Sequence, residues 1–161
     1  MSYLVDGNNV MAQRVGWHRD KPKARRMLMD ELARFAQSKR AQVTVVFDGA
    51  PEEYFPDGAS YKGVRIFYAE RGSNADERIK KMVEQERERR TLIVVTSDRT
   101  LADYVRRCGA QVLRSGEFRK RLEETKDSSH QSKAEPRASG DLSEWMRYFG
   151  VAPEDDESSD E

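Results

Sequence analysis

Four aspartates are the residues of this sequence best placed to do chemistry together. Three of them directly follow short apolar runs typical of buried strands, and the fourth stands at the start of a predicted helix. In a mainly parallel sheet the carboxyl ends of the strands share one edge, where such side chains gather. Clustered carboxylates repel one another unless a cation lies between them, and hard divalent cations prefer oxygen ligands. The pattern predicts a Mg²⁺ or Mn²⁺ site formed by Asp6, Asp48, Asp76 and Asp98.

Each aspartate alone has a simpler interpretation. An Asp after a strand commonly caps the following helix or forms a turn. Asp98 follows Ser97, and Asp76 stands three residues after Ser73, so both fit capping patterns. The metal-site interpretation therefore depends on the four aspartates together, and no single one of them carries it.

The elements that must position the four aspartates alternate between strands and helices. The alternation predicts an α/β fold with a mainly parallel sheet and helices on both faces. The expected strands cover residues 2–5, 43–47, 64–68, 92–95 and 111–113. The expected helices cover about 21–40, 99–108 and 117–124, with another that begins near 74 and ends within the charged run 84–90.

Two connections in this pattern have turn or loop composition. The strand at 2–5 runs into Asp6-Gly7-Asn8-Asn9, and we expect Gly7 to let the backbone turn tightly beside the site. Residues 10–20 and 50–63 are expected to form loops.

The charge of the chain is segregated although its net value is zero. Residues 1–126 carry a net charge of +7, whereas residues 127–161 carry −7. We expect a polyanion-binding domain over 1–126, a polar linker without periodicity over 127–140, a short amphipathic helix over 141–150 and a disordered acidic tail over 151–161.

The remaining composition bounds the class of protein. The single cysteine, Cys108, excludes an intrachain disulfide framework and favours a cytoplasmic location. No stretch approaches the ~20 apolar residues of a membrane helix.

The motifs that contain the four aspartates carry a family resemblance. Together they resemble the YacP-like branch of the NYN-domain proteins, which are PIN-like metal-dependent ribonucleases, over roughly residues 2–125. The resemblance implies a three-layer α/β/α fold, a pocket for one or two Mg²⁺ or Mn²⁺ ions, and endonucleolytic cleavage of RNA. The motifs are Leu4-Val5-Asp6-Gly7-Asn8-Asn9-Val10, Val46-Phe47-Asp48-Gly49, Asn74-Ala75-Asp76 and Val95-Thr96-Ser97-Asp98.

The resemblance also assigns roles by position. It makes the four aspartates the acidic ligands, with Asp6 and Asp98 in direct contact with metal. Asn8 or Asn9 faces the pocket, and Asn8 and Ser97 orient water or the scissile phosphate. Glu77 approximates a second acid that some relatives carry. The implied partners are mRNA or structured RNA and the ribosome, with a role in mRNA decay or RNA processing.

Basic and aromatic residues near the same rim are candidates for RNA contact. Cations would bind phosphates in a salt-sensitive way, and an exposed ring could stack an unpaired base. The candidates are Arg14, Trp17, Arg19, Arg71, Arg99, Arg119 and Lys120.

Two other function classes fit parts of the sequence. A haloacid-dehalogenase phosphatase also opens with a strand and an aspartate, but it needs Asp where Asn8 stands, and its later Gly-Asp-x-x-x-Asp block is missing here. A catalytically inactive RNA-binding module is the other alternative, and the presence of all four aspartates argues against it.

Overall fold

The computed structural model describes residues 1–69 and 74–138, with side chains as far as Lys126. Met1–Thr125 forms one compact unit, and the chain from Lys126 onward is a separate unit. The elements are β1 (Ser2–Asp6), α1 (Gly7–Met11), η1 (Trp17–Arg19), α2 (Lys21–Lys39), β2 (Gln42–Phe47), β3 (Ala59–Tyr61), β4 (Val64–Tyr68), α3 (Ala75–Gln85), η2 (Arg89–Thr91), β5 (Leu92–Val95), α4 (Arg99–Arg107), β6 (Gln111–Leu113) and α5 (Ser115–Ala138).

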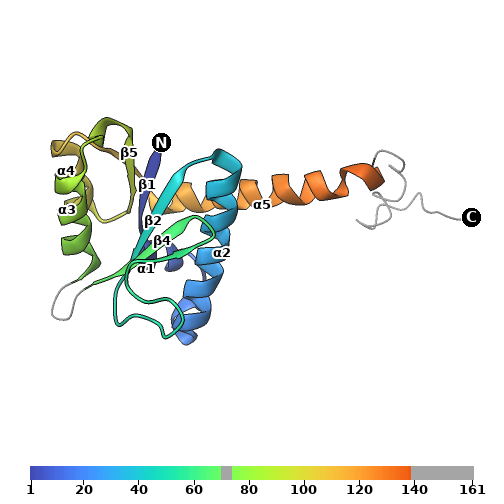
Figure 1. Cartoon of the computed structure of the whole chain (residues 1–161), viewed down its shortest axis with the longest axis horizontal. Helices are drawn as coiled ribbons and strands as arrows, with labels where there is room; N and C mark the ends of the chain where they lie inside the picture. The colour runs from blue at the N-terminus through green and yellow to red at the C-terminus, as the bar shows by residue number, and fades with distance from the viewer. Residues whose placement is uncertain (70–73, 139–161) are drawn as a thin grey trace, which may run out of the picture. The chain divides into compact units, whose positions relative to one another are not determined.

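The sheet of the compact unit confirms the predicted α/β fold. Its six strands have the order β3-β4-β2-β1-β5-β6, and only β3 runs antiparallel to its neighbour. β1 lies at the centre, with Asp6 opposite Val46 of β2 and Val5 opposite Val95 of β5 (Figure 1). The chain reverses its direction of travel across the sheet between β1 and β5. This switch point is where parallel α/β sheets bind ligands.

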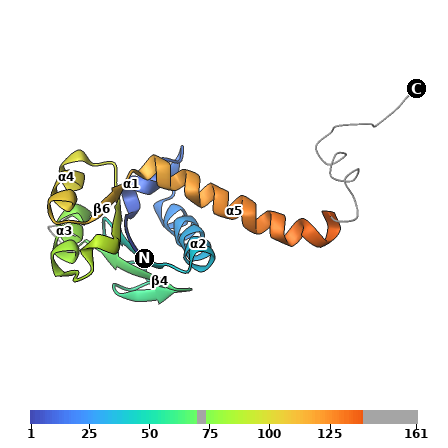
Figure 2. The same cartoon turned by 90° about the horizontal axis from the view of Figure 1, so that it is seen from above.

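Helices cover both faces of the sheet, as expected for three layers (Figure 2). One core cluster packs α1, α2 and the start of α5 on the sheet, around the rings of Tyr3, Phe35 and Phe118. The other cluster packs α3 and α4 on the opposite face through Ile79 and Leu101, among others. Strands buried on both faces read as continuous apolar runs, which is why β2 and β5 were visible in the sequence.

Side-chain caps start the helices that follow the strands. Asp20 accepts a hydrogen bond from the Lys23 N–H at the start of α2, as its position before Pro22 predicts. Asn74 caps α3 by accepting from Glu77 N–H at 3.0 Å. The predicted cap Ser73 lies outside the described residues.

Two short elements replace predicted turns or loops. α1 is helical where a tight turn was expected, because the helical turn buries Val10 and Met11 in the core. β3 lies inside the predicted loop 50–63 and pairs with β4 through a two-residue hairpin turn. Lys62 and Gly63 both have positive φ there, +48° and +90°, as a type I′ turn requires.

The last helix is longer than predicted. α5 continues to Ala138, so the prediction of a polar linker without periodicity is corrected for residues 127–138. A helix shows a periodic apolar stripe where it packs against another part of the protein. A helix that has already formed can extend further at little cost without such a stripe, so the lack of periodicity did not mark its end. The predicted helix at 141–150 and the acidic tail at 151–161 lie outside the described residues. None of the described helices is both long enough and apolar enough to span a bilayer.

Candidate active site

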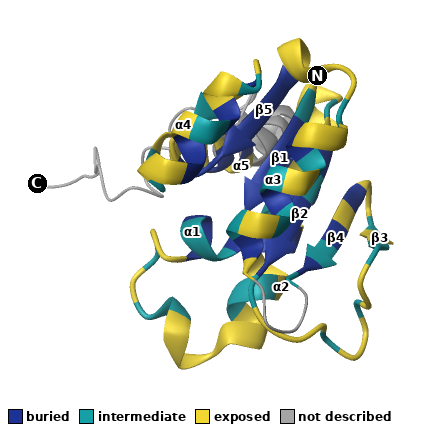
Figure 3. Ribbon diagram, turned by 90° about the vertical axis from the view of Figure 1, so that its left-hand side faces the viewer, coloured by how far each residue is buried: buried dark blue, intermediate teal, exposed yellow. Residues whose placement is uncertain are grey.

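Asp6 is the most buried of the four aspartates. It ends β1, the central strand, and is only 4% exposed; Figure 3 shows the buried strands β1, β2 and β5 in dark blue. Burial raises the pKa of Asp6 to about 7, and the negative charges of Asp76 and Asp48 act in the same direction. Hydrogen bonds from Thr96 and from the Asn9 backbone lower it in part. Asp6 is therefore a carboxyl group whose ionisation is costly unless a cation compensates it.

Asp76 is the second carboxyl group of this rim whose ionised form is disfavoured. It is the second residue of α3, and burial raises its pKa to about 6. The charge of Asp98 and a hydrogen bond to it contribute next, and then the charge of Asp48, while Lys80 opposes the shift. Asp76 and Asp98 thus lie in direct contact although they belong to different helix starts.

Asp48 and Asp98 each use one carboxylate oxygen to hold the local backbone. Asp48 Oδ1 accepts from Ala75 N–H at 2.7 Å, which ties the end of β2 to the helix that carries Asp76. Asp98 Oδ1 accepts from Leu101 N–H at 3.0 Å and caps α4. The capping interpretation of Asp98 is therefore correct, and it coexists with the contact to Asp76.

The structure thus brings the four aspartates to one edge of the sheet from four different elements. Their donor set, hard carboxylate oxygens with mutual repulsion and partial dehydration, fits Mg²⁺ or Mn²⁺ chemically. Among the side chains that the structure describes, those of residues 1–69 and 74–126, no group of three or more His, Cys, Asp or Glu is already arranged to hold a metal ion. Binding would require these carboxylates to rotate toward a common centre.

The two asparagines after Asp6 connect β1 to different neighbours. Asn8 Oδ1 accepts from the Asp48 N–H at 2.9 Å, so Asn8 lies on the side of the site that holds Asp48. Asn9 Oδ1 accepts from Ser97 N–H at 2.8 Å and from the Ser115 hydroxyl. Of the two side chains, that of Asn8 contacts a predicted ligand residue, Asp48, whereas Asn9 reaches Asp6 through its backbone.

Ser97 makes a structural contact of its own. Its Oγ accepts from the Ser115 N–H at 3.0 Å, which joins the end of β5 to the first residue of α5. This contact gives Ser97 a positioning role for α5. The hydroxyl still has its O–H to donate, so the predicted contact with water or phosphate stays a prediction.

Thr96 is a site residue that the sequence reasoning missed. Its fully buried hydroxyl donates to Asp6 Oδ2 at 3.1 Å and accepts from Asp98 N–H at 3.1 Å. One side chain therefore fixes the orientation of Asp6 and the start of α4 together. A hydroxyl residue at the end of a strand otherwise made of apolar residues was the available signal.

Arg25 of α2 is a second missed residue, and it holds the loop after β2. Its guanidinium donates to the carbonyl oxygens of Asp48 and Ala50 and pairs with Glu52 at 3.2 Å. It also lies over the rings of Phe47 and Tyr68, 5.4 and 5.3 Å from their centroids. The sequence shows Arg25 only as one cation among several in this helix, so no local pattern could have identified it.

Gly7 is required for close packing, which corrects its predicted role in a tight turn. Its φ is not positive, but a Cβ on it would lie 2.5 Å from Phe47 Cδ1 and 3.0 Å from Val45 Cγ2. Only glycine lets the start of α1 approach β2 this closely. The same approach brings Asp6 and Asn8 against the end of β2.

Gly7→Ala is expected to destabilise the protein by about 1–3 kcal/mol, because the added methyl group overpacks a rigid core. Gly116→Ala is the matched control, since its Cβ would meet only Gln13 Oε1, at 3.4 Å. The control should leave stability equal or slightly higher, because alanine favours a helix. Urea denaturation measures both variants. Equal midpoints for Gly7→Ala and the wild type would contradict this account of Gly7.

Asp98→Asn is expected to keep the cap of α4 while removing the carboxylate charge. Asparagine caps a helix as well as aspartate does, so stability should change by less than about 0.5 kcal/mol. Cleavage of RNA should nevertheless fall at least about ten-fold, because the carboxylate charge is lost. Thermal unfolding and cleavage rates of the same preparation provide the measurement. Unchanged cleavage would leave Asp98 with its capping role alone.

The stability of the metal-free protein is expected to fall as pH rises. Asp6 and Asp76 hold their protons more tightly in the folded protein, with pKa values of about 7 and about 6, than at the ordinary Asp value of 3.8. Their contribution to stability is complete below that ordinary value and is lost as pH rises through 6 and 7. Mn²⁺ needs ionised carboxylates, so its stabilising effect should grow over the same interval.

Thermal unfolding with EDTA and with Mn²⁺ across this pH range tests both trends. Asp6→Asn should flatten the pH dependence of the metal-free protein, because it removes the group with the larger shift. The same slope in this variant and in the wild type would show that the carboxyl groups of the site do not control it.

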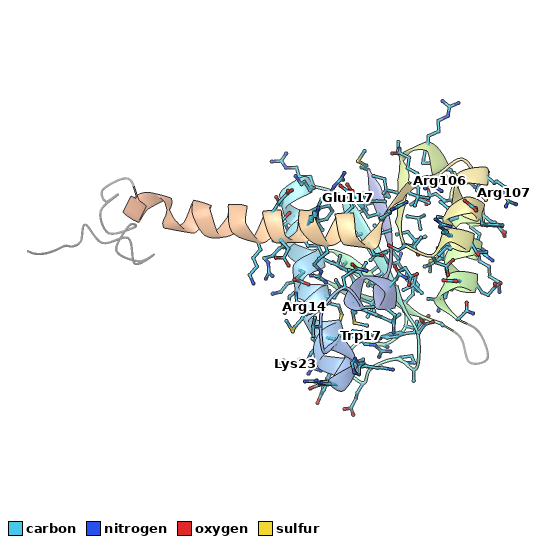
Figure 4. The ribbon with its side chains drawn as sticks, turned by 180° about the vertical axis from the view of Figure 1, so that it is seen from behind. Arg14, Trp17, Lys23, Arg106, Arg107 and Glu117 are labelled. Carbon is cyan, nitrogen blue, oxygen red and sulfur yellow. The ribbon has the colours of Figure 1, made fainter. Side chains whose placement is uncertain are left out.

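The predicted RNA-contact residues differ in their exposure and in their ion pairs. Arg14 and Arg119 both pair with Glu31 at 2.8 Å, and Arg119 is only 13% exposed, so Arg119 has a structural role. Trp17 is half-buried against the core. Arg19, Arg99 and Lys120 are exposed, and Arg71 lies outside the described residues. Figure 4 shows Arg14, Trp17 and Lys23 near one another, away from Arg106 and Arg107 of α4.

A hollow of about 510 Å³ on the described surface lies away from the four aspartates. Ser2, Gln42 and Leu92, which begin β1, β2 and β5, line it together with α3 residues such as Arg78. The acidic rim stands at the opposite ends of the same strands. Size alone therefore does not locate the candidate active site.

A three-layer α/β domain with carboxylates gathered at its switch point defines a PIN-like nuclease fold. The chain matches the model of the YacP-like NYN domain over residues 3–146, and it belongs to that family. This confirms the resemblance seen in the sequence motifs. Family and fold together support a nuclease of the hydrolase class that acts on RNA.

Solved structures share this fold. The crystal structure of a tryptophan-to-leucine mutant of Rae1 (YacP) from Bacillus subtilis is 23% identical with a TM-score of 0.66, over 81% of this chain and 79% of that one. Another crystal structure of Rae1 (YacP) from Bacillus subtilis is 20% identical with a TM-score of 0.64, over 94% and 91%. Curated proteins give no match to this chain.

Proposed function

We propose that this protein is a metal-dependent endoribonuclease that hydrolyses RNA phosphodiester bonds at the four aspartates. One observation carries the proposal: carboxyl groups from β1, the end of β2, α3 and the start of α4 gather at one edge of the sheet, where burial first, and then the charges of neighbouring aspartates, raise the pKa values of Asp6 and Asp76. Such an arrangement costs stability, and it is useful to a protein that places a cation there.

The chain's own residues have separable tasks in this proposal. Asp6 and Asp98 would hold the cation directly, with Asp48 and Asp76 completing the acidic set. Thr96 keeps Asp6 and the start of α4 in register, while Arg25 and Asn8 hold the backbone of Asp48. When bound, Mg²⁺ or Mn²⁺ supplies charge neutralisation at the phosphate and lowers the pKa of water.

The substrate is proposed to be mRNA or structured RNA, in mRNA decay or RNA processing, with the ribosome as a partner. These finer assignments, like the cytoplasmic location, come from the family resemblance and from composition. They stay predictions.

Mapping transcript 5′ ends in cells that carry either the wild type or Asp6→Asn tests the function and finds the substrate. Equal amounts of the two proteins must be confirmed first. Internal 5′ ends present with the wild type and lost with the variant are expected. Identical sets of ends would contradict the proposed function, and RNA binding without any cleavage would favour the inactive binding module.

A further inference from the structure

A cleft of about 290 Å³ is lined by the segment 11–20, by α2 and by Arg119 of α5. Met11, the last residue of α1, forms part of its wall, and α1 begins directly after Asp6. The five residues of α1 span about 7.5 Å at 1.5 Å per residue. A bound strand that leaves the four aspartates along α1 therefore meets this cleft within a short distance.

The charges around the cleft favour an anion. Arg14, Arg19, Lys23 and Arg119 line it together with two acids. Glu31 is neutralised by its pairs with Arg14 and Arg119, and Asp20 is engaged by the start of α2. Among the described residues, the ion pairs include neither Arg19 nor Lys23. Both side chains are exposed, so two cations are available to phosphate groups.

The wall of the cleft favours the flat face of a base. Trp17 packs on the core with one part of its ring and lines the cleft with another. Val15, 99% exposed, and Met27, 37% exposed, add apolar surface beside it. The Lys21 ammonium lies 5.8 Å from the Trp17 ring centroid, so a base at this ring would have a further cation near its phosphate. Aromatic stacking with cations along the backbone is the usual way to bind single-stranded nucleic acid.

We propose that the Trp17 cleft is a binding site for an unpaired nucleotide of the RNA substrate. A ring recessed in a cleft cannot reach bases stacked inside an A-form duplex, whereas it can receive a base that is splayed out. The inference rests on the proposed nuclease function and adds a nucleotide-binding site to it. Arg19 and Lys23 bind the flanking phosphates.

Binding to the full-length Asp6→Asn, Trp145→Phe variant tests the cleft without loss of RNA by cleavage. Trp17 is then the only indole in the chain, because the sequence contains two tryptophans. A single-stranded oligouridylate should change the Trp17 emission, and it should bind about ten-fold more tightly than a duplex of equal length at the same salt concentration. An emission that stays constant while the strand binds, or equal affinity for the duplex, would overturn the proposal.

Charge reversal supplies the matched comparison. Adding Arg19→Glu and Lys23→Glu should weaken strand binding about ten-fold and reduce the slope of log affinity against log salt by about 1.4, or 0.7 for each lost phosphate contact. Arg106→Glu together with Arg107→Glu makes the same charge change, −4, on α4, far from the cleft in Figure 4, and should have a much smaller effect. Equal effects of the two changes would mean that only overall charge matters, and the cleft assignment would fail.

Cleavage by the wild-type protein, measured separately with Mn²⁺, distinguishes a failure of the cleft proposal from a failure of the nuclease proposal. Cleavage without any Trp17 response removes the cleft proposal and leaves the nuclease proposal standing. A Trp17 response to the single strand without cleavage supports the cleft as an RNA site and contradicts the nuclease proposal.

Discussion

Asp6→Asn is expected to lower metal-dependent RNA cleavage at least about a hundred-fold while the fold stays intact, because it removes a charge at the reacting centre. The same change should stabilise the metal-free protein at neutral pH. Asp6 is 4% exposed, and its ionised form is disfavoured by burial and by Asp76 and Asp48. Activity and stability should therefore move in opposite directions, which a merely misfolded variant cannot produce.

Asp103→Asn is the matched control for this prediction. Asp103 is an exposed α4 residue whose only ion pair among the described residues is with Arg106 at 3.5 Å. Removing its charge should change stability by no more than about 0.5 kcal/mol and leave cleavage unchanged. Cleavage rates with Mn²⁺ and thermal unfolding with EDTA measure both variants. Asp6→Asn that cleaves as fast as Asp103→Asn would remove Asp6 from the mechanism.

Arg25→Met is expected to destabilise the protein by about 3 kcal/mol, the largest stability change anticipated for a single residue near the site. Met roughly keeps the length of the side chain, but it leaves Glu52 and the carbonyl oxygens of Asp48 and Ala50 without their donor. The loop that carries Asp48 should loosen, and RNA cleavage should fall even where the protein is still folded.

Arg26→Met removes a neighbouring cation and serves as the control. Arg26 also faces Glu52, at 3.7 Å, but its side chain is 55% exposed, whereas that of Arg25 is 11% exposed. Exposed pairs contribute little, so Arg26→Met should cost less than about 1 kcal/mol. Urea midpoints with an unchanged m-value measure the difference. Equal costs for the two variants would show that Arg25 is not the anchor of this loop.

The sequence predicted the features that a local pattern of residues encodes. Buried parallel strands are apolar on both faces, so β2 and β5 were recognisable, and with them the positions of Asp48 and Asp98 at the strand ends. The strand at 2–5 and the helix start after the third strand placed Asp6 and Asp76 on the same rim, and the family motifs then assigned all four aspartates the role of acidic ligands. The structure confirms the parallel sheet and brings the four aspartates to one edge.

The supporting contacts could not be predicted, because their partners are distant in the chain. Thr96 and Asp6 are 90 residues apart, and Arg119 is 88 residues from Glu31. Gly7 was predicted to allow a turn, whereas its actual constraint is the ring of Phe47 on the neighbouring strand. Such constraints come from tertiary packing and leave no periodic signal.

The requirement for a divalent cation is the most direct test of the account. Purified wild-type protein is incubated with an end-labelled single-stranded RNA, once with Mn²⁺ and once with excess EDTA, at a pH above the pKa of Asp6, about 7. The account predicts internal fragments with Mn²⁺, absent with EDTA and restored when Mn²⁺ is added back in excess. Intact RNA under all three conditions, or equal cleavage with EDTA, would contradict a nuclease site built from these four aspartates.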